Sequence, residues 1–319
     1  MSDAVIEIAG LRKKFRSLRG GPRVALDGLD MEVQSGGVHG FLGPNGSGKT
    51  TTIRTLLGVV RADAGTIKLF GQPVPQQLPD VIGRIGAIVE SPQFFPAFSG
   101  RRNLMLLAAT AGIDERRVDE VLDKVGLAQR AKDRYKTYSL GMKQRLAVAG
   151  ALLREPTLLI LDEPMNGLDP AGMREIRNLM QEVAANGTTV LLSSHILAEV
   201  QQVCDSVTIL SHGKQIASGA VQDVLASGGA TEVVVRVDDL GTAQRILASA
   251  ELTVRQENGR LVVGGVADPA AITKLLAEEG HYVSELTPTT ADLESVFLQL
   301  TGTGDQLSVP VGVSAGEVA

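Results

Sequence analysis

The chain has 319 residues, of which 44% are hydrophobic, enough for two domains with cores of their own. A formal net charge of −5 gives no electrostatic reason to expect a broad nucleic-acid surface. Aromatic residues make up 3% of the chain and Trp is absent, which disfavours a base-stacking surface. We therefore expect no nucleic acid among its partners.

Cysteine usage and hydropathy indicate the compartment. The single cysteine, Cys204, excludes an intrachain disulfide and a thiolate metal cluster, suits a reducing cytosol, and is expected in a helix. The N-terminus carries acidic residues such as Glu7 without an apolar signal core, and the longest apolar run, 146–153, is bounded by Arg145 and Arg154. We expect a chain that is neither exported nor membrane-spanning.

The first predicted elements are strands. Residues 5–8 alternate as a half-buried strand, and a basic stretch from Arg12 to Arg23, broken by glycines, separates them from a strand at 29–33. Phe15 stands inside the basic stretch. An exposed ring there would stack on a purine, but a ring that closes the edge of a small core fits the spacing equally well.

A glycine-rich loop follows a predicted buried strand at 38–42 and precedes a predicted helix at 51–57. Such a loop folds its backbone N–H groups into a nest around one anion, and the helix adds the positive end of its dipole. We call residues 43–50 the phosphate loop. Its residues, with the one that follows, are Gly43, Pro44, Asn45, Gly46, Ser47, Gly48, Lys49, Thr50 and Thr51.

The phosphate loop predicts nucleotide binding. Lys49 would reach the β- and γ-phosphates, and Thr50 would offer its hydroxyl to Mg²⁺. A glycine-rich turn that binds nothing is the alternative, but the strand before the loop and the helix after it favour the functional interpretation.

Further strands at 65–70 and 85–89 follow, the second ending at Glu90, and 99–140 is predicted to be largely helical. Ser139 and Gly141 stand where another helix begins. The N-terminus of that helix is a second anion-binding end, although any capped helix looks similar.

Residues 157–163 form an apolar strand that ends in two carboxylates, Asp162 and Glu163. Continuous apolar strands are typical of parallel sheets, whose carboxyl ends bind ligands, so both carboxylates are expected beside the phosphate loop. Asp162 would hold Mg²⁺ through water, and Glu163 would polarise a water that attacks the γ-phosphate. A solvated acidic turn is the weaker alternative, because Pro164 ends the strand abruptly at an apolar edge.

The next buried strand, 188–194, brings His195 to its carboxyl end. A lone histidine is usually structural, but one beside a phosphate loop and a carboxylate can position a γ-phosphate. Strands at 206–210 and 215–218 and a helix to Ala226 complete the first predicted domain, residues 1–226.

The composition changes at the flexible linker Ser227-Gly228-Gly229. Residues 227–301 are predicted to form a second domain of βαββαβ order, ferredoxin-like, with one added helix. It contains no cluster of catalytic side chains, so we interpret it as a regulatory or docking module or as structural support. Residues 302–319 are predicted to be a loose tail.

Together these motifs resemble the ATP-binding cassette (ABC) ATPases over roughly residues 4–226. The resemblance implies an α/β fold with a mixed sheet core, an antiparallel β subdomain and a helical subdomain. The signature helix separates this family from kinases and GTPases, which lack it. The matching residues are the Walker A motif at 43–50, Walker B at 158–162 with catalytic Glu163, the signature at 139–144 with Ser139, Gly141 and Gln144, the D-loop ending in Asp169, the switch His195, and Phe15 as the adenine-stacking aromatic.

One position departs from the family pattern. Where the family has a glutamine that contacts Mg²⁺ and the transmembrane partner, this chain has Glu90, and Gln93 is an alternative occupant. A carboxylate still ligates the metal but adds negative charge near the γ-phosphate. Glu at this position is similar to the branch that clears peptide antibiotics such as bacitracin, whereas residues 292–302 resemble the tail of anthracycline-exporter ATPases.

The resemblance implies an ATPase that uses ATP and Mg²⁺ and closes head to tail with a second cassette, from the same chain or a paralogue. Because no segment spans a membrane, separate integral permease subunits would carry the transport path and hold the chain at the cytoplasmic face of the membrane. The expected function is to power an exporter of drugs, antibiotics or other amphipathic molecules.

Two other functions compete. Soluble ABC ATPases of ribosomes carry two cassettes in one chain, and those of chromosomes insert a long coiled coil between Walker A and the signature; this chain has neither feature. A nucleotide-gated regulator that barely hydrolyses ATP is disfavoured because Glu163 is intact.

Overall fold

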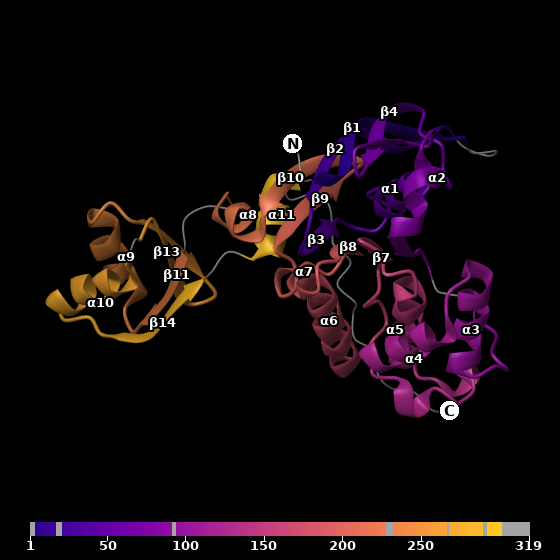
Figure 1. Cartoon of the computed structure of the whole chain (residues 1–319). Helices are drawn as coiled ribbons and strands as arrows, with labels where there is room; N and C mark the ends of the chain where they lie inside the picture. The colour runs from indigo at the N-terminus through magenta and orange to yellow at the C-terminus, as the bar shows by residue number, and fades with distance from the viewer. Residues whose placement is uncertain are drawn as a thin grey trace, which may run out of the picture. The chain divides into compact units, whose positions relative to one another are not determined.

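The computed structural model describes residues 4–16, 21–90, 94–227, 232–266, 268–289 and 292–301. These residues form two compact units, the first reaching Val221 and the second running from Gln222 through the last helix (Figure 1). Gln93, the linker glycines Gly228 and Gly229, and the tail 302–319 lie outside the described residues. None of the described helices combines the length and the apolar character that a membrane crossing requires.

One sheet of the first unit is antiparallel, in the order β2-β1-β4-β5. Its strands are β1 (Ala4–Phe15), β2 (Arg23–Gln34), β4 (Ala64–Leu69) and β5 (Gln72–Val74). β1 extends the predicted strand at 5–8 as far as Phe15, because its backbone stays paired with β2 up to Arg23. Two of its basic residues also pair with carboxylates of neighbouring segments. Arg12 lies 2.7 Å from Asp27, and Lys13 lies 3.0 Å from Asp63.

The other sheet has six strands in the order β10-β9-β3-β8-β7-β6. The strands from β9 to β6 are parallel to their neighbours and β10 is antiparallel, as predicted for a mixed sheet. β3, β7 and β8 are buried along their whole length, which explains why apolar residues predominate in them. The strands are β3 (Val38–Leu42), β6 (Ile85–Ile88), β7 (Leu158–Asp162), β8 (Thr189–Ser194), β9 (Ser206–Ser211) and β10 (Lys214–Ala220).

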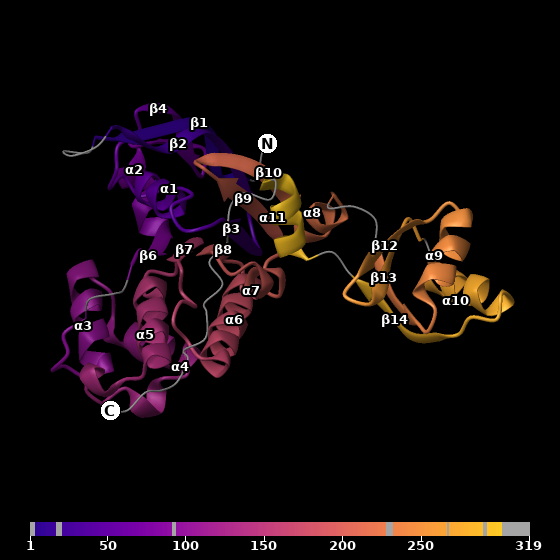
Figure 2. The same cartoon turned by 180° about the vertical axis from the view of Figure 1, so that it is seen from behind.

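Three helices form a group of their own beside the sheets: α3 (Gly100–Ala111), α4 (Glu115–Lys124) and α5 (Leu140–Leu152) (Figures 1 and 2). Ser99, Asp114 and Ser139 cap their N-termini by accepting a backbone N–H each. The remaining helices of this unit are α1 (Lys49–Leu56), α2 (Leu78–Val81), α6 (Pro170–Ala185) and α7 (Leu197–Gln201), and α8 (Val221–Ser227) begins at the boundary between the two units.

Cys204 is not in a helix, contrary to the prediction, because α7 already ends at Gln201. Its thiol packs beneath β3: a Cβ on Gly40 would lie 3.1 Å from the sulfur. Burial raises the pKa of the Cys204 thiol far above its usual value.

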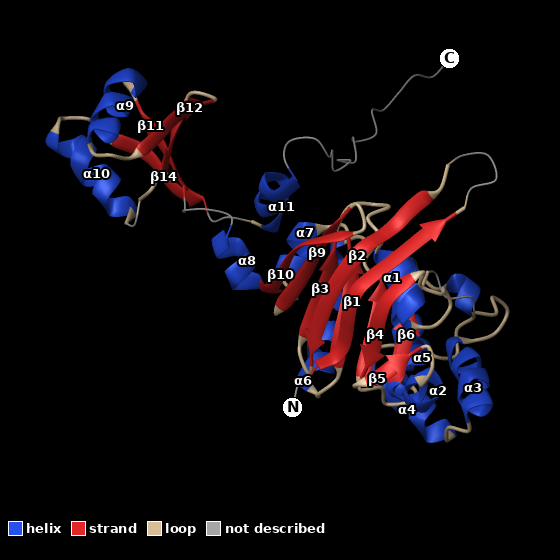
Figure 3. Cartoon of the chain, turned by 90° about the horizontal axis from the view of Figure 1, so that it is seen from above, coloured by secondary structure: helices blue, strands red, loops and turns tan. Residues whose placement is uncertain are grey.

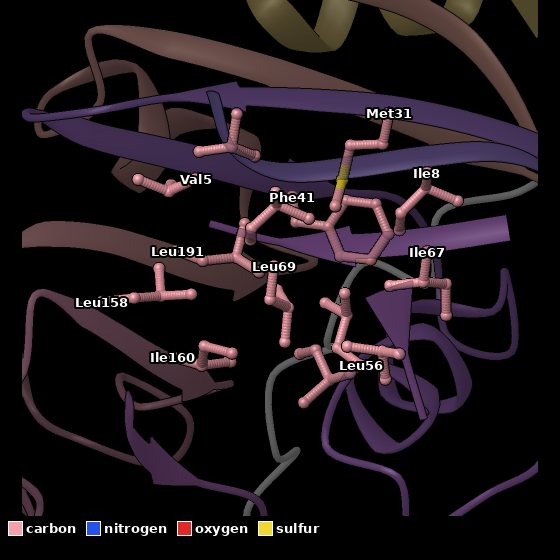
Figure 4. Packing of buried hydrophobic residues seen from close by; sticks show 14 of the residues in the cluster. Val5, Ile8, Met31, Phe41, Leu56, Ile67, Leu69, Leu158, Ile160 and Leu191 are labelled. Atoms are coloured by element: carbon pink, nitrogen blue, oxygen red, sulfur yellow. The ribbon is translucent and has the colours of Figure 1, made fainter. Parts of the chain in front are cut away.

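The main core lies between the two sheets, with Phe41 of β3 at its centre (Figure 4). Met31, Ile8 and Ile67 reach it from the antiparallel sheet, and Leu56 reaches it from α1. Each such side chain, fully buried, contributes about 1.5–3 kcal/mol. Figure 3 shows the strands of the unit gathered in one block beside α3, α4 and α5. Packing in this core therefore fixes the positions of β3 and α1, the two elements on either side of the phosphate loop.

The second unit has the predicted βαββαβ order and an antiparallel sheet in the order β12-β13-β11-β14. Asn258 and Gly259 both have positive φ at the predicted hairpin turn. Valines and leucines on one face of the sheet pack against Leu247 and Leu276 of its helices. The elements are β11 (Glu232–Val237), α9 (Leu240–Ser249), β12 (Thr253–Glu257), β13 (Arg260–Gly264), α10 (Pro269–Glu278), β14 (Val283–Thr289) and the added helix α11 (Leu293–Thr301).

Candidate functional site

The phosphate loop connects β3 to α1 at the carboxyl edge of the six-stranded sheet. At two of its glycines a side chain would have no room, because the backbone of other segments lies against the loop there. A Cβ on Gly43 would lie 2.3 Å from the carbonyl oxygen of Leu210, and one on Gly48 would lie 2.7 Å from that of Ala25. Both residues also have positive φ, so the sequence pattern is a steric requirement of this loop.

The turn between β9 and β10 supports the phosphate loop. The amide of Gly213 donates to the carbonyl oxygen of Ser47 at 2.9 Å, while its own carbonyl oxygen accepts from the amide of Asp27 at 2.9 Å. This turn thus ties the loop to β2. Nothing in the local sequence around Gly213 indicated this contact, which depends on how distant segments pack.

Lys49 is almost completely buried, with 5% of its side chain exposed. Its ammonium donates to the carbonyl oxygen of Gly43 at 2.7 Å and lies 3.2 Å from Oε1 of Glu163. The structure therefore brings together two residues predicted to act on one γ-phosphate.

Thr50 and Asp162 meet across the sheet edge: the Thr50 hydroxyl donates to Oδ2 of Asp162 at 2.9 Å. Ser193 donates to the other carboxylate oxygen, Oδ1. Ser193 pairs with Asp162 in the register of β7 and β8, so its hydroxyl orients the carboxylate toward Thr50. From the sequence, Ser193 was expected only as part of a buried strand; its register with Asp162 on the neighbouring strand was the signal that could have identified its role.

Glu163 and His195 also lie together, with Nδ1 of His195 2.7 Å from Oε2 of Glu163. Glu163 adopts a φ of 51°, which is unusual for a residue with a side chain. Its backbone N–H donates to the hydroxyl oxygen of Ser193 at 3.0 Å. Strained backbone of this kind costs about 1–3 kcal/mol and gathers at functional sites.

Glu90 follows β6 at the same sheet edge, and it too has a positive φ, 66°. Its carboxylate forms an ion pair with Arg54 of α1 and is largely exposed. Arg54 stands four residues after Thr50, so it lies one helical turn further along the same face of α1. The ion pair with Arg54 was not predicted.

A hollow of about 330 Å³ lies in front of the phosphate loop. Phe15, with 41% exposure, borders it, and so does Arg23, which was not predicted as a site residue. The signature residues and Asp169 are not among its lining residues. The hollow is lined by Phe15, Arg23, Ala25, Asn45, Gly46, Gly48, Lys49, Thr50, Thr51 and Glu163.

The signature and D-loop residues cap helices instead. Ser139 begins α5, where its hydroxyl oxygen accepts the amide of Met142 at 3.3 Å, and Gly141 and Gln144 follow on the same helix. Asp169 begins α6 by accepting the amide of Gly172 at 2.9 Å. These residues do not complete the hollow of their own chain.

The residues at the loop fit a nucleotide with its metal. Among the described residues, the hydroxyl of Ser47 is buried without a partner, which suits a phosphate oxygen at the loop. The Thr50 hydroxyl and the Asp162 carboxylate form the kind of donor set that Mg²⁺ shares with phosphates and waters. The described part of the chain holds no cluster of three or more His, Cys, Asp or Glu side chains suited to a metal.

Comparison with known proteins identifies the family. The family model described as "ABC transporter" matches residues 26–166, and a model described as a domain of unknown function matches 231–294. The bacitracin transport ATP-binding protein BcrA of Bacillus licheniformis is 38% identical over 306 residues, 94% of this chain and 98% of the relative. The daunorubicin resistance ATP-binding protein DrrA3 of Streptomyces coeruleorubidus is 36% identical over 313 residues, 95% and 97%.

Among solved structures, cbiO1 from Clostridium perfringens, part of the ABC transporter complex cbiONQ, matches with a TM-score of 0.63 at 30% identity. The match covers 70% of this chain and 92% of that one. The fold and the site thus define a phosphate-loop ATPase. Within that class, the chain belongs to the ATP-binding proteins of ABC transporters, which hydrolyse ATP to drive transport and work with membrane permease subunits.

Proposed function

We propose that this chain powers a membrane exporter of drugs, antibiotics or other amphipathic molecules, using ATP and Mg²⁺. One observation carries the proposal: Thr50 with Asp162, and Lys49 with Glu163 and His195, meet at a single edge of the sheet. The similarity to BcrA and DrrA3 along nearly the whole chain supports export of this class of compound.

Each residue of the site has its own role in ATP hydrolysis. The loop amides and Lys49 bind the phosphates, and Thr50 and Asp162 would hold Mg²⁺, which neutralises phosphate charge when bound. Glu163 accepts a proton from the attacking water, and His195 fixes the direction of its carboxylate through Nδ1. Phe15 stacks on the adenine. Glu90, which pairs with Arg54 here, would be a further carboxylate ligand for Mg²⁺.

A second cassette completes the site. Ser139, Gly141, Gln144 and Asp169 lie outside the hollow of their own chain, so the N-terminus of α5 is available to another subunit's nucleotide. Two helix N-termini then face one triphosphate, which holds the subunits together until hydrolysis removes the shared charge. The pair acts through integral permeases at the cytoplasmic face of the membrane, with the second unit as a regulatory or docking module.

Copurification tests this function. The tagged chain, expressed with its native membrane background, should bring down an integral membrane protein and, in proteoliposomes, show Mg²⁺-dependent ATPase activity. Bacitracin and daunorubicin, added separately, are the first compounds to try as stimulants. A purified complex that neither binds nor hydrolyses ATP in the presence of Mg²⁺ contradicts the proposal.

A further inference from the structure

Arg23 is one of the residues that line the hollow, together with Phe15 and Gly46 of the phosphate loop. It is the first residue of β2 and pairs directly with Phe15 in the register of β1 and β2. On its other side lies the phosphate loop, since a Cβ built on Gly46 would be 3.1 Å from Nη2 of Arg23. Its guanidinium therefore lies beside the loop, and both Arg23 and Phe15 line the hollow.

The charge of Arg23 is unmatched within the described residues, because no carboxylate pairs with it. Two nearby basic residues of β1 differ in this respect: Arg12 pairs with Asp27 at 2.7 Å and Lys13 with Asp63 at 3.0 Å. In the same hollow, the charge of Lys49 is already met by Glu163. An arginine that is left unpaired beside an anion-binding loop adds positive potential where a polyphosphate enters.

We propose that Arg23 binds the α-phosphate of the nucleotide. The inference rests on the proposed function, in which Phe15 takes the adenine and the phosphate loop takes the β- and γ-phosphates. The nucleotide group that lies between these two ends carries the α-phosphate, and a guanidinium binds phosphate oxygens through two parallel N–H bonds. Gly46, having no side chain, leaves room for the guanidinium against the loop.

Equilibrium binding to the full-length protein tests the contact. With ATP and ADP as ligands, Arg23→Gln should weaken binding of both by about the same factor, on the order of 10-fold, since a charge-assisted hydrogen bond is lost. Arg23→Lys should recover part of the loss. Arg12→Gln is the matched control, an arginine on the adjacent strand that does not line the hollow, and should bind as the parent does.

A second ligand separates the α-phosphate from the sugar. Binding of 2′,3′-dideoxy-ADP, which lacks both ribose hydroxyls, should be weakened by Arg23→Gln as much as binding of ADP. If the dideoxy ligand is insensitive to Arg23→Gln, Arg23 contacts the ribose and the inference is wrong. It is also wrong if ATP loses more affinity than ADP, or if neither loses any. A parent protein that binds no ATP at all would instead overturn the proposed function.

Discussion

Nδ1 of His195 lies 2.7 Å from Oε2 of Glu163. The two residues come from different strand ends, β8 and β7, and the parallel pairing of those strands is what brings them together. The imidazole thus restrains the carboxylate that we propose to activate water, while Lys49 approaches the other oxygen of the same group at 3.2 Å.

Glu163→Gln should abolish hydrolysis and keep nucleotide binding. The amide has nearly the shape of the carboxylate but does not accept a proton from water, so the turnover number should fall by about 10²–10⁴. ATP should then hold two cassettes together, which light scattering with and without ATP detects. Glu182→Gln, an exposed glutamate on α6 remote from the hollow, is the control and should hydrolyse normally. Normal turnover in Glu163→Gln would remove Glu163 from the mechanism.

Glu90→Gln should leave ATP affinity within about twofold and change how turnover responds to Mg²⁺ and to substrate. The carboxylate is exposed and paired with Arg54, so its loss should not disturb the loop. Under the proposed function, the substitution would remove a negative charge from the Mg²⁺ site. ATPase activity of the complex, titrated with Mg²⁺ in the presence and absence of transported compound, reads this out. Identical titrations for parent and variant would show that Glu90 has no role beyond its ion pair with Arg54.

Gly213→Ala should weaken nucleotide binding, although Gly213 touches no ligand. Its φ is 77°, and a Cβ there would lie 2.7 Å from the carbonyl oxygen of Ala25, which displaces the support under Ser47. Gly71→Ala is matched in conformation, since Gly71 also has a φ of 77°, but a Cβ there meets no atom within 4 Å.

Both variants place an alanine in the left-handed backbone region, which costs about 1 kcal/mol. Only Gly213→Ala also disturbs a residue that supports the phosphate loop. Thermal unfolding with and without ATP separates the effects. The stabilisation conferred by ATP should shrink in Gly213→Ala and persist in Gly71→Ala. Equal ATP stabilisation in both would show that the turn does not shape the loop.

His39 should make folding stability depend on pH. The ring is buried in β3 between the hydroxyls of Ser206, at 2.8 Å, and Thr208, at 2.9 Å. Burial lowers its pKa from 6.5 to about 4, so between these values the unfolded chain binds more protons than the folded one. The free energy of unfolding therefore falls as the pH drops from about 6.5 to about 4, by up to about 3 kcal/mol from this residue.

Urea unfolding at a series of pH values measures this effect. His39→Gln keeps a hydrogen-bonding side chain without the titration, so its stability should be lower at pH 7 but flatter between pH 4 and 6.5. If the parent and the variant lose stability in parallel over that window, His39 is not the titrating group.

The sequence predicted the parts of the site that lie within one short segment. The phosphate loop, and the carboxylates at the end of an apolar strand, carry their geometry in local pattern, so Lys49, Thr50, Asp162 and Glu163 were placed near one another in advance. Arg23 was missed because its place in the site depends on its pairing with Phe15 across two strands, which a local sequence pattern does not report.

Two other differences have the same origin. Cys204 was predicted to lie in a helix, but the chain leaves α7 after Gln201 to enter β9. The Arg54 partner of Glu90 depends on how α1 packs beside the end of β6, which no local periodicity reports.

The burial of the Cys204 thiol has a practical consequence. Its thiol is 9% exposed and holds its proton, so it reacts poorly with maleimides and other thiol reagents. Since the chain contains no other cysteine, one introduced at a surface position becomes the sole reactive thiol. A pair of spin labels or fluorophores on two subunits would then report the closing of the cassettes directly, without first removing any native residue.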